Sequence, residues 1–119
     1  MALAELGAVV LDCPDPGALA AFYAEVLGGT VEGEGDWVDL KPPGGPALAF
    51  QAAPGFVAPR WPAPGHSQQF HLDLTVEDLD AAEAGVLALG AKPLDTGDRT
   101  RTFRVYADPA GHPFCLCAC

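Results

Sequence analysis

The sequence predicts an α+β fold made of two similar halves, each with the element order βαβββ. Three observations support this prediction. A chain of 119 residues has a usual size for one domain and is too short for two ordinary ones. A strand-like segment that leads into a helical pattern occurs twice. A turn rich in proline and glycine that leads into a short apolar strand also occurs twice.

The first half begins with a strand and a helix. Residues 8–15 alternate in the manner of a strand. Apolar residues then recur at helical spacing, at Leu19, Phe22, Tyr23, Val26 and Leu27. Gly28 and Gly29 follow, as is typical of the C-terminus of a helix.

The second half repeats this arrangement. Residues 71–78 alternate like a strand, and the helical spacing follows at Leu79, Ala82, Val86, Leu87 and Leu89. The pattern stops at Gly90. Asp15 and Asp78 occupy matching places, so each is expected near the start of a helix.

The closing strands of the two halves correspond as well. A turn at residues 42–46 leads into residues 47–50, and a turn at residues 109–113 leads into residues 114–117. Each half has room for two more short strands between its helix and its closing strand. These strands are expected near residues 30–32, 36–41, 92–95 and 102–107.

A long linker is expected between the halves. We predict one domain over residues 1–119, with halves at about 6–52 and about 70–119 and a linker at about 53–69. The prolines and glycines of the linker prevent a regular helix or a central strand. Phe56 and Trp61 either attach the linker to the body of the domain or line a pocket, and both interpretations stay open.

Charge and hydropathy exclude two kinds of partner. Sixteen acidic and six basic residues give a formal net charge of -10, which would repel a phosphate backbone, so nucleic acid is not expected. No apolar run approaches the roughly 20 residues that cross a bilayer, so no membrane is expected. The first six residues lack the basic start of an export signal. We therefore expect a cytoplasmic protein.

The four cysteines have an unusual distribution. They are Cys13, Cys115, Cys117 and Cys119, the last three at alternate positions. This spacing is neither a C-x-x-C motif nor a disulfide framework. Reduced thiols, some of them packed as small apolar groups, are expected in the absence of an export signal. A thiolate metal site is the alternative.

Several short motifs together resemble a known family. They are Phe22-Tyr23, Leu27-Gly28, residues 71–74, residues 89–91 and residues 108–114. In their order, spacing and duplication they are similar to the vicinal oxygen chelate superfamily, which includes glyoxalase I, bleomycin-resistance proteins and extradiol dioxygenases. The chain resembles most the small glyoxalase-like branch, whose final strand reads F-C. The resemblance covers about residues 6–118.

This resemblance implies a curved mixed sheet with an inner cleft and with both helices on its outer face. Alternation along each strand then assigns side chains to the cleft. The first strand would contribute Val10 and Asp12, and the matching strand His71 and Asp73. The inward pairs of the closing strands would be Leu48 with Phe50 and Cys115 with Cys117.

Enzymes of the superfamily hold a divalent metal with side chains from the first and last strands of each half. The corresponding positions here are Ala8, Leu48, His71 and Cys115, of which His71 and Cys115 can coordinate through their side chains. A catalytic site normally needs at least three protein ligands. We therefore expect no cofactor. A zinc, nickel, iron or manganese ion is the alternative, with Asp73, Asp12 or Cys117 recruited as a further ligand.

Two functions remain open at this point. One is a binding protein, similar to bleomycin-resistance proteins, that holds a small aromatic or cationic organic ligand without a metal. The residues expected to contact this ligand are Val10, Asp12, Trp37, Leu48, Phe50, Trp61, Asp73, Cys115 and Cys117. The other is a lyase, isomerase or dioxygenase relative in which His71 acts as acid or base beside Asp73. The resemblance implies a homodimer in either case.

Overall fold

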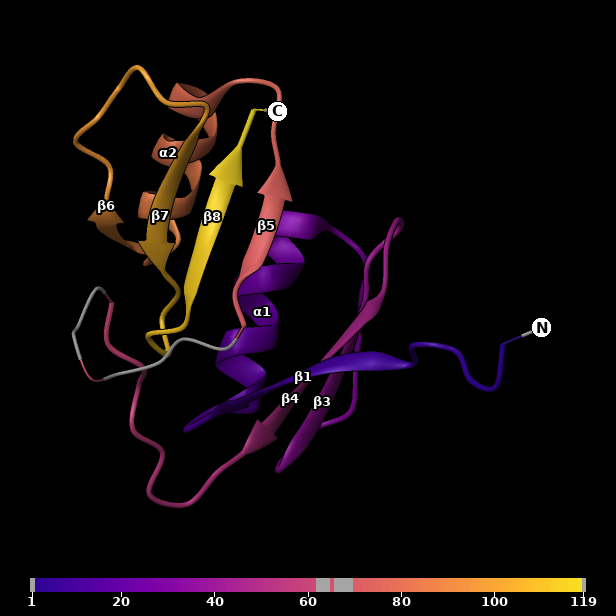
Figure 1. Ribbon diagram of the computed structural model, residues 1–119. Coiled ribbons are helices and arrows are strands. Elements are labelled where there is room, and N and C mark those ends of the chain that lie inside the picture. Colours follow the sequence, from indigo (N-terminus) through magenta and orange to yellow (C-terminus); the bar gives the residue numbers. More distant parts are fainter. Residues whose placement is uncertain (1, 62–64, 66–69, 119) are drawn as a thin grey trace. The chain divides into compact units, whose positions relative to one another are not determined.

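The chain folds into two βαβββ units (Figure 1). The computed structural model describes residues 2–61, 65 and 70–118, and the chain divides into compact units at Met1–Phe56 and Val57–Cys119. The first unit contains β1 (Ala8–Cys13), α1 (Pro16–Leu27), β2 (Thr30–Glu32), β3 (Trp37–Lys41) and β4 (Ala47–Ala52). The second contains β5 (Leu72–Thr75), α2 (Leu79–Ala88), β6 (Lys92–Asp95), β7 (Phe103–Ala107) and β8 (Pro113–Cys117). The predicted order of elements is confirmed in both halves.

Each unit has its own four-stranded sheet with the same topology. The strand order is β1-β4-β3-β2 in the first unit and β5-β8-β7-β6 in the second. In both sheets the first and last strands of the unit pair in parallel, and the other pairs are antiparallel. In each unit the last strand of the sequence therefore lies beside the first strand in the sheet.

An aspartate begins each helix, as the sequence predicted. The carboxylate of Asp15 accepts a hydrogen bond of 3.2 Å from the backbone nitrogen of Ala18, and that of Asp78 accepts one of 3.1 Å from Ala81. Such caps satisfy backbone donors that lack a partner in the first turn. In the described part of the chain, neither helix is long and apolar enough to cross a membrane.

Apolar packing attaches α1 to the first sheet. Leu19, Phe22 and Tyr23 are buried on one side of the helix. The Tyr23 ring stacks on the ring of Phe50 in β4, with centroids 5.8 Å apart and planes 13° from parallel. Burial of large aromatic side chains is a main source of core stability. The core of the first unit therefore lies between α1 and the β3 and β4 strands.

The strand register corrects the predicted side of Leu48 and Phe50. Leu48 is the partner of Val9, and Phe50 is the partner of Leu11. Paired residues project to the same face of a sheet, so Leu48 and Phe50 lie on the face that packs against α1. The prediction that they face a cleft is wrong. Both are large apolar side chains in a strand that alternates with alanine, and the larger members fill the space under the helix.

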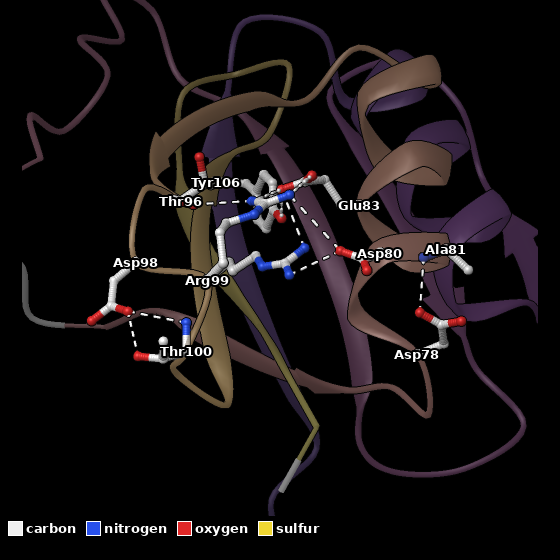
Figure 2. A network of polar contacts seen from close by, with 10 residues as sticks. Asp78, Asp80, Ala81, Glu83, Thr96, Asp98, Arg99, Thr100 and Tyr106 are labelled. Carbon is white, nitrogen blue, oxygen red and sulfur yellow. Dashed lines mark hydrogen bonds and ion pairs between the residues drawn. The ribbon is translucent and has the colours of Figure 1, made fainter.

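Polar contacts, in addition to apolar burial, attach α2 to the second sheet. Among the residues of α2, Val86 is the buried one. Arg104 of β7, whose side chain is 5% exposed, donates to the Asp80 carboxylate at 2.9 Å. The Tyr106 hydroxyl donates to the carboxylate of Glu83 at 2.6 Å (Figure 2). Ion pairs and hydrogen bonds therefore contribute to the attachment of α2, whereas α1 is attached by aromatic packing.

Candidate functional site

Three side chains that could bind a metal or a polar ligand meet on the second sheet. His71 directly precedes β5, Asp73 lies within β5, and Cys115 lies in β8. One ligand atom from each residue lies within 4.8 Å of the other two. The Nε2 atom of His71 is 3.2 Å from the Oδ1 atom of Asp73. The structure thus brings together the two predicted catalytic residues and the predicted metal ligands.

Strand pairing explains this meeting. Asp73 is the parallel partner of Cys115, and Thr75 is the partner of Cys117. The neighbouring strand β7 adds two residues to the same face, because Val105 is the partner of Cys115 and Phe103 is the partner of Cys117. These residues share the face opposite α2, which we call the Cys115 face and define by His71, Asp73, Thr75, Phe103, Val105, Cys115 and Cys117. Asp73, Cys115 and Cys117 thus lie on one face of the sheet, as alternation along their strands predicted.

The Cys115 thiol is held in its protonated form. Burial raises its pKa to about 11, and the negative charge of Asp73 and a hydrogen bond to that carboxylate act in the same direction. Cys115 is only 8% exposed, whereas the Asp73 side chain is 67% exposed. A buried thiol that donates to a carboxylate is a weak nucleophile at neutral pH.

Two charged residues beside this cluster could not be identified from the sequence. Asp95 of β6 is the partner of Val105, which places it on the Cys115 face. Arg101 donates through Nη2 to the Oδ1 atom of Asp95 at 3.0 Å, and its guanidinium lies 4.4 Å from the centroid of the Phe103 ring. Arg101 opposes the rise in the pKa of Cys115, and Asp95 adds to it. Alternation from Cys115 could have identified Phe103, but Arg101 lies in a loop, where alternation gives no direction.

Besides Leu48 and Phe50, three of the predicted ligand contacts lie in the first unit. Val10 and Asp12 are exposed on the face of β1 opposite α1. Trp37 is the partner of Gln51, which is the partner of Asp12, so Trp37 lies on the same face. The Trp37 indole nitrogen donates to the Asp39 carboxylate at 3.1 Å. These positions match the predicted face, and their role in binding stays a prediction.

Two further predicted ligand contacts, Trp61 and Cys117, are not free exposed side chains. Trp61 is half-buried, and its indole nitrogen is buried with no hydrogen-bond acceptor among the described residues. Cys117 is disulfide-bonded, whereas Cys13 and Cys115 are free thiols. The expectation of reduced cysteines is therefore wrong at Cys117. A sulfur in a disulfide cannot serve as a thiolate ligand, which removes Cys117 from the possible metal ligands. The fourth cysteine, Cys119, lies outside the described residues.

The donor set of the cluster fits a divalent metal better than the sequence suggested. Imidazole nitrogen, carboxylate oxygen and thiolate sulfur are all zinc ligands, and three protein ligands with an open position are typical of catalytic zinc. His71, Asp73 and Cys115 supply these three groups. In the first unit the register places Ala49, and not the predicted Leu48, opposite Val10, as Cys115 lies opposite Asp73. The matching positions Ala8 and Ala49 supply no ligand, since alanine side chains cannot coordinate.

Solved structures with the same fold come from several bacteria. A glyoxalase/bleomycin resistance protein/dioxygenase family enzyme from Burkholderia phytofirmans is 20% identical, covers 95% of this chain and 97% of its own, and has a TM-score of 0.75. A glyoxalase family protein from Enterococcus faecalis is 26% identical over 98% and 99% of the two chains, with a TM-score of 0.69. The fosfomycin resistance protein FosX from Listeria monocytogenes, complexed with Mn(II) and a dihydroxypropylphosphonic acid, is 16% identical over 98% and 93%, with a TM-score of 0.68.

Family-level comparison gives the same assignment. No curated protein matches the chain. The glyoxalase-like domain family matches residues 8–117, which is nearly the whole sequence. This range begins at the first residue of β1 and ends at the last residue of β8. The chain therefore belongs to the glyoxalase-like family.

Proposed function

We propose that this protein binds a small organic molecule on the Cys115 face, without the complete metal site of the superfamily. The observation that carries the proposal is the meeting of His71, Asp73 and Cys115, with one ligand atom of each within 4.8 Å of the other two. Burial and the negative charge of Asp73 keep the Cys115 thiol protonated, so that His71, Asp73 and Cys115 form a set of polar groups around an exposed carboxylate. A few converging polar groups beside apolar side chains are typical of ligand sites.

The charges of this face favour a cationic or polar ligand with an aromatic part. Asp73 and Asp95 provide two carboxylates, of which Asp95 is already paired with Arg101. Phe103 is 38% exposed and offers a ring for stacking. A net charge of -10 also raises the local concentration of cations near the protein.

Two proteins of similar structure agree with a role in small-molecule binding. The Burkholderia phytofirmans structure belongs to a family named for bleomycin resistance, and the Listeria monocytogenes protein was solved with a phosphonic acid. They supply a class of ligand to test, namely small polar organic molecules.

Ligand-induced thermal stabilisation tests this proposal. Bleomycin and benzyltrimethylammonium serve as cationic probes, and we expect at least one to raise the melting temperature of the wild type. Asp73→Asn should weaken binding about tenfold, because a hydrogen bond to a charged group contributes about 1.5 kcal/mol. His71→Ala should also weaken it. Glu25→Gln removes one negative charge from α1 and is the control. Equal affinities of wild type, Asp73→Asn and His71→Ala would exclude the Cys115 face.

A metal-dependent lyase, isomerase or dioxygenase-like enzyme is the second candidate. The observation that favours it is the approach of three different donor atoms within 4.8 Å. His71, Asp73 and Cys115 would hold the ion, which when bound would act as a Lewis acid on a substrate oxygen. Cys115 would have to lose its proton first, so metal affinity should fall as the pH decreases.

Calorimetric titration with zinc(II), nickel(II), iron(II) or manganese(II) tests the second candidate. We expect one ion per chain in the wild type and no comparable binding in His71→Ala, Asp73→Asn or Cys115→Ser. Titrations in two buffers of different ionisation enthalpy should show one proton released per ion, because the thiol is protonated in the free protein. Unchanged affinity in Cys115→Ser would exclude the site.

Two predictions from the sequence belong with this proposal. We propose a homodimer in the cytoplasm with no nucleic-acid or membrane partner, supported by the family membership and the acidic composition. Sedimentation velocity measures the oligomeric state directly. A monomer at micromolar concentration would contradict the dimer.

A further inference from the structure

The loop between β6 and β7 sends two arginines to opposite faces of the second sheet. Arg99 contacts Glu83 of α2, on the helix side. Arg101, two residues later, contacts Asp95 on the Cys115 face. Residues 96–102 therefore connect the helix side of the sheet with the proposed ligand site.

The contact on the helix side is geometrically specific. The Glu83 carboxylate accepts from Nη2 of Arg99 at 2.8 Å and from Nη1 at 3.0 Å, which is a bidentate pair (Figure 2). Nη1 of Arg99 also donates to the backbone oxygen of Thr96 at 3.0 Å, within the same loop. Glu83 itself is fixed, because the Tyr106 hydroxyl donates to it and its side chain is only 17% exposed. Glu83 is thus an anchor for the loop.

The loop between the two arginines is held by short-range bonds. The Asp98 carboxylate accepts from the backbone nitrogen of Thr100 at 3.0 Å and from its hydroxyl at 2.6 Å. The backbone nitrogen of Arg101 donates to the backbone oxygen of Asp98 at 3.4 Å. These bonds limit independent movement of the two arginines. A displacement of Arg99 should therefore reach Arg101.

Arg101 is held on the Cys115 face by three kinds of contact. Its Nη2 atom donates to the Oδ1 atom and to the backbone oxygen of Asp95, both at 3.0 Å. Its Nη1 atom is 3.3 Å from Oδ2 of the same carboxylate. The guanidinium also stacks over Phe103. Its positive charge opposes the two negative charges, of Asp73 and Asp95, that act on Cys115.

We propose that Glu83 is a positioning residue for the proposed ligand site: by holding Arg99 it sets the loop and so places the Arg101 guanidinium on the Cys115 face. The significance for a ligand rests on the proposed function, whereas the coupling between Glu83 and Arg101 does not. Arg101 would then set the charge preference of the site, and Glu83 would act on that preference from the opposite side of the sheet.

The test compares two alkylating reagents at Cys115, so it needs no ligand. Iodoacetate is an anion and iodoacetamide is neutral, and both react with the same thiolate. The ratio of their rates at one fixed pH reports the local charge, independently of the thiolate fraction. Cys115-containing peptides are quantified by mass spectrometry in the wild type, Glu83→Gln, Arg99→Lys, Arg101→Gln and the control Glu25→Gln.

The expected changes distinguish positioning from a direct charge effect. Arg101→Gln removes the nearby positive charge and should lower the iodoacetate to iodoacetamide ratio roughly threefold. Glu83→Gln should lower it as well, because the loop that carries Arg101 loses its anchor on α2 and the Arg101 guanidinium shifts relative to Cys115. A direct field effect has the opposite sign, since removal of a negative charge would raise the ratio. Arg99→Lys keeps the charge but loses the planar bidentate contact, so it should also lower the ratio.

Two outcomes overturn the proposal. One is a ratio in Glu83→Gln and Arg99→Lys that equals or exceeds that of the wild type. The other is a double variant, Glu83→Gln with Arg101→Gln, whose rate ratio is lower than that of Arg101→Gln by the whole effect of Glu83→Gln alone. The effects of coupled positions should not be additive in this way. If Glu83→Gln fails to fold, the rate ratio in Arg99→Lys alone tests the proposal. Expected ratios with no stabilisation by bleomycin or benzyltrimethylammonium would overturn the proposed function and leave the positioning role supported.

Discussion

Asp73 makes two contacts that determine the chemistry of the Cys115 face. Its carboxylate lies 3.2 Å from the imidazole of His71, and a carboxylate oxygen lies within 4.8 Å of the Cys115 sulfur, whose pKa it helps to raise. In a Cys-His catalytic pair the imidazole takes the proton of the thiol. Here the Asp73 carboxylate lies close to both groups, and it stabilises the protonated thiol. The cluster is therefore arranged for hydrogen bonding until a metal ion or a change of charge removes that proton.

Asp73→Asn should make Cys115 more acidic and more reactive. The negative charge of Asp73 and its hydrogen bond help to raise the thiol pKa to about 11, so their removal should lower this pKa, while burial of the sulfur maintains part of the rise. Iodoacetamide labelling of Cys115 as a function of pH measures the change. The rate below the pKa should increase severalfold in Asp73→Asn. Asp39→Asn, on the first sheet, is the control. An unchanged profile in Asp73→Asn would assign the whole pKa shift to burial.

Gly29, after the end of α1, should not tolerate a side chain. Its φ is +103°, and a Cβ atom there would overlap the backbone oxygen of Lys41 at the end of β3. Gly35 has φ of +77°, but a Cβ atom added to it would meet nothing within 4 Å, so it separates the two effects. We expect Gly35→Ala to cost about 1 kcal/mol of unfolding free energy and Gly29→Ala at least about 2 kcal/mol. Urea unfolding measures both. Equal losses would show that the Lys41 contact relaxes easily.

At the scale of elements, the helices are attached by different forces. α1 buries aromatic rings, and the stacking of Tyr23 on Phe50 lies at the centre of its contact with the sheet. α2 is attached largely through Asp80 and Glu83, which bind Arg104 and Tyr106 of β7. Burial and the hydrogen bond with Glu83 raise the pKa of Tyr106, so its hydroxyl remains a donor. The stability of the second unit should therefore depend on the ionisation of Glu83.

Glu83→Gln should reduce stability at neutral pH and have little effect in strong acid. The hydrogen bond from Arg99, followed by that from Tyr106, lowers the pKa of Glu83 from 4.5 to about 2. A lowered pKa stabilises the folded state above the unfolded value, and this contribution is lost as the pH falls from about 4.5 toward about 2. The loss at neutral pH should be about 2 kcal/mol after allowance for screening at the half-exposed Arg99.

Urea unfolding of wild type and Glu83→Gln at several pH values checks this prediction. The difference in unfolding free energy should be constant above about pH 5 and should decrease toward pH 2. Glu25→Gln, on the exposed side of α1, should match the wild type throughout. A difference that stays constant down to pH 2 would mean that shape, and not the charge of Glu83, accounts for the loss.

The elements could be predicted from the sequence because local patterns determine them. Asp15 and Asp78 cap helices where the duplicated pattern placed them, and the short strand at residues 30–32 forms as expected. The faces of β4 could not be predicted in this way. Its segment around Leu48 and Phe50 is apolar throughout, so polarity does not distinguish its two sides, and only packing against α1 decides between them.

The candidate site was predictable only where it lies on strands. Alternation along β5 and β8 identified His71, Asp73 and Cys115 as neighbours on one face. Arg101 was missed, because it lies in a loop and its direction is set by contacts with Asp95 and Phe103 that alternation does not reveal. The disulfide at Cys117 was missed as well, since spacing alone does not fix the pairing of cysteines.

At the scale of the whole molecule, duplication repeats the topology but not the chemistry. Both units have the same strand order and the same position for the helix. The donor groups of the candidate site come from the second unit, whereas Ala8 of the first unit occupies a matching position without a donor. The second unit also holds its helix by charged groups. Binding chemistry and sensitivity to acid are therefore concentrated in the same half of the chain.

This asymmetry predicts that the two units respond differently to acid. The ionised Glu83 carboxylate, which holds α2 to Tyr106, loses its stabilising contribution as the pH falls from about 4.5 toward about 2, while the apolar packing of α1 does not titrate. In hydrogen-exchange mass spectrometry, backbone amides of residues 79–88 should lose protection at pH 3 before those of residues 16–27 do, after correction for intrinsic exchange rates. Glu83→Gln should show part of this loss already at neutral pH. Simultaneous loss in both helices would show that the units unfold as one cooperative body, and earlier loss in α1 would show that its aromatic packing is the weaker attachment.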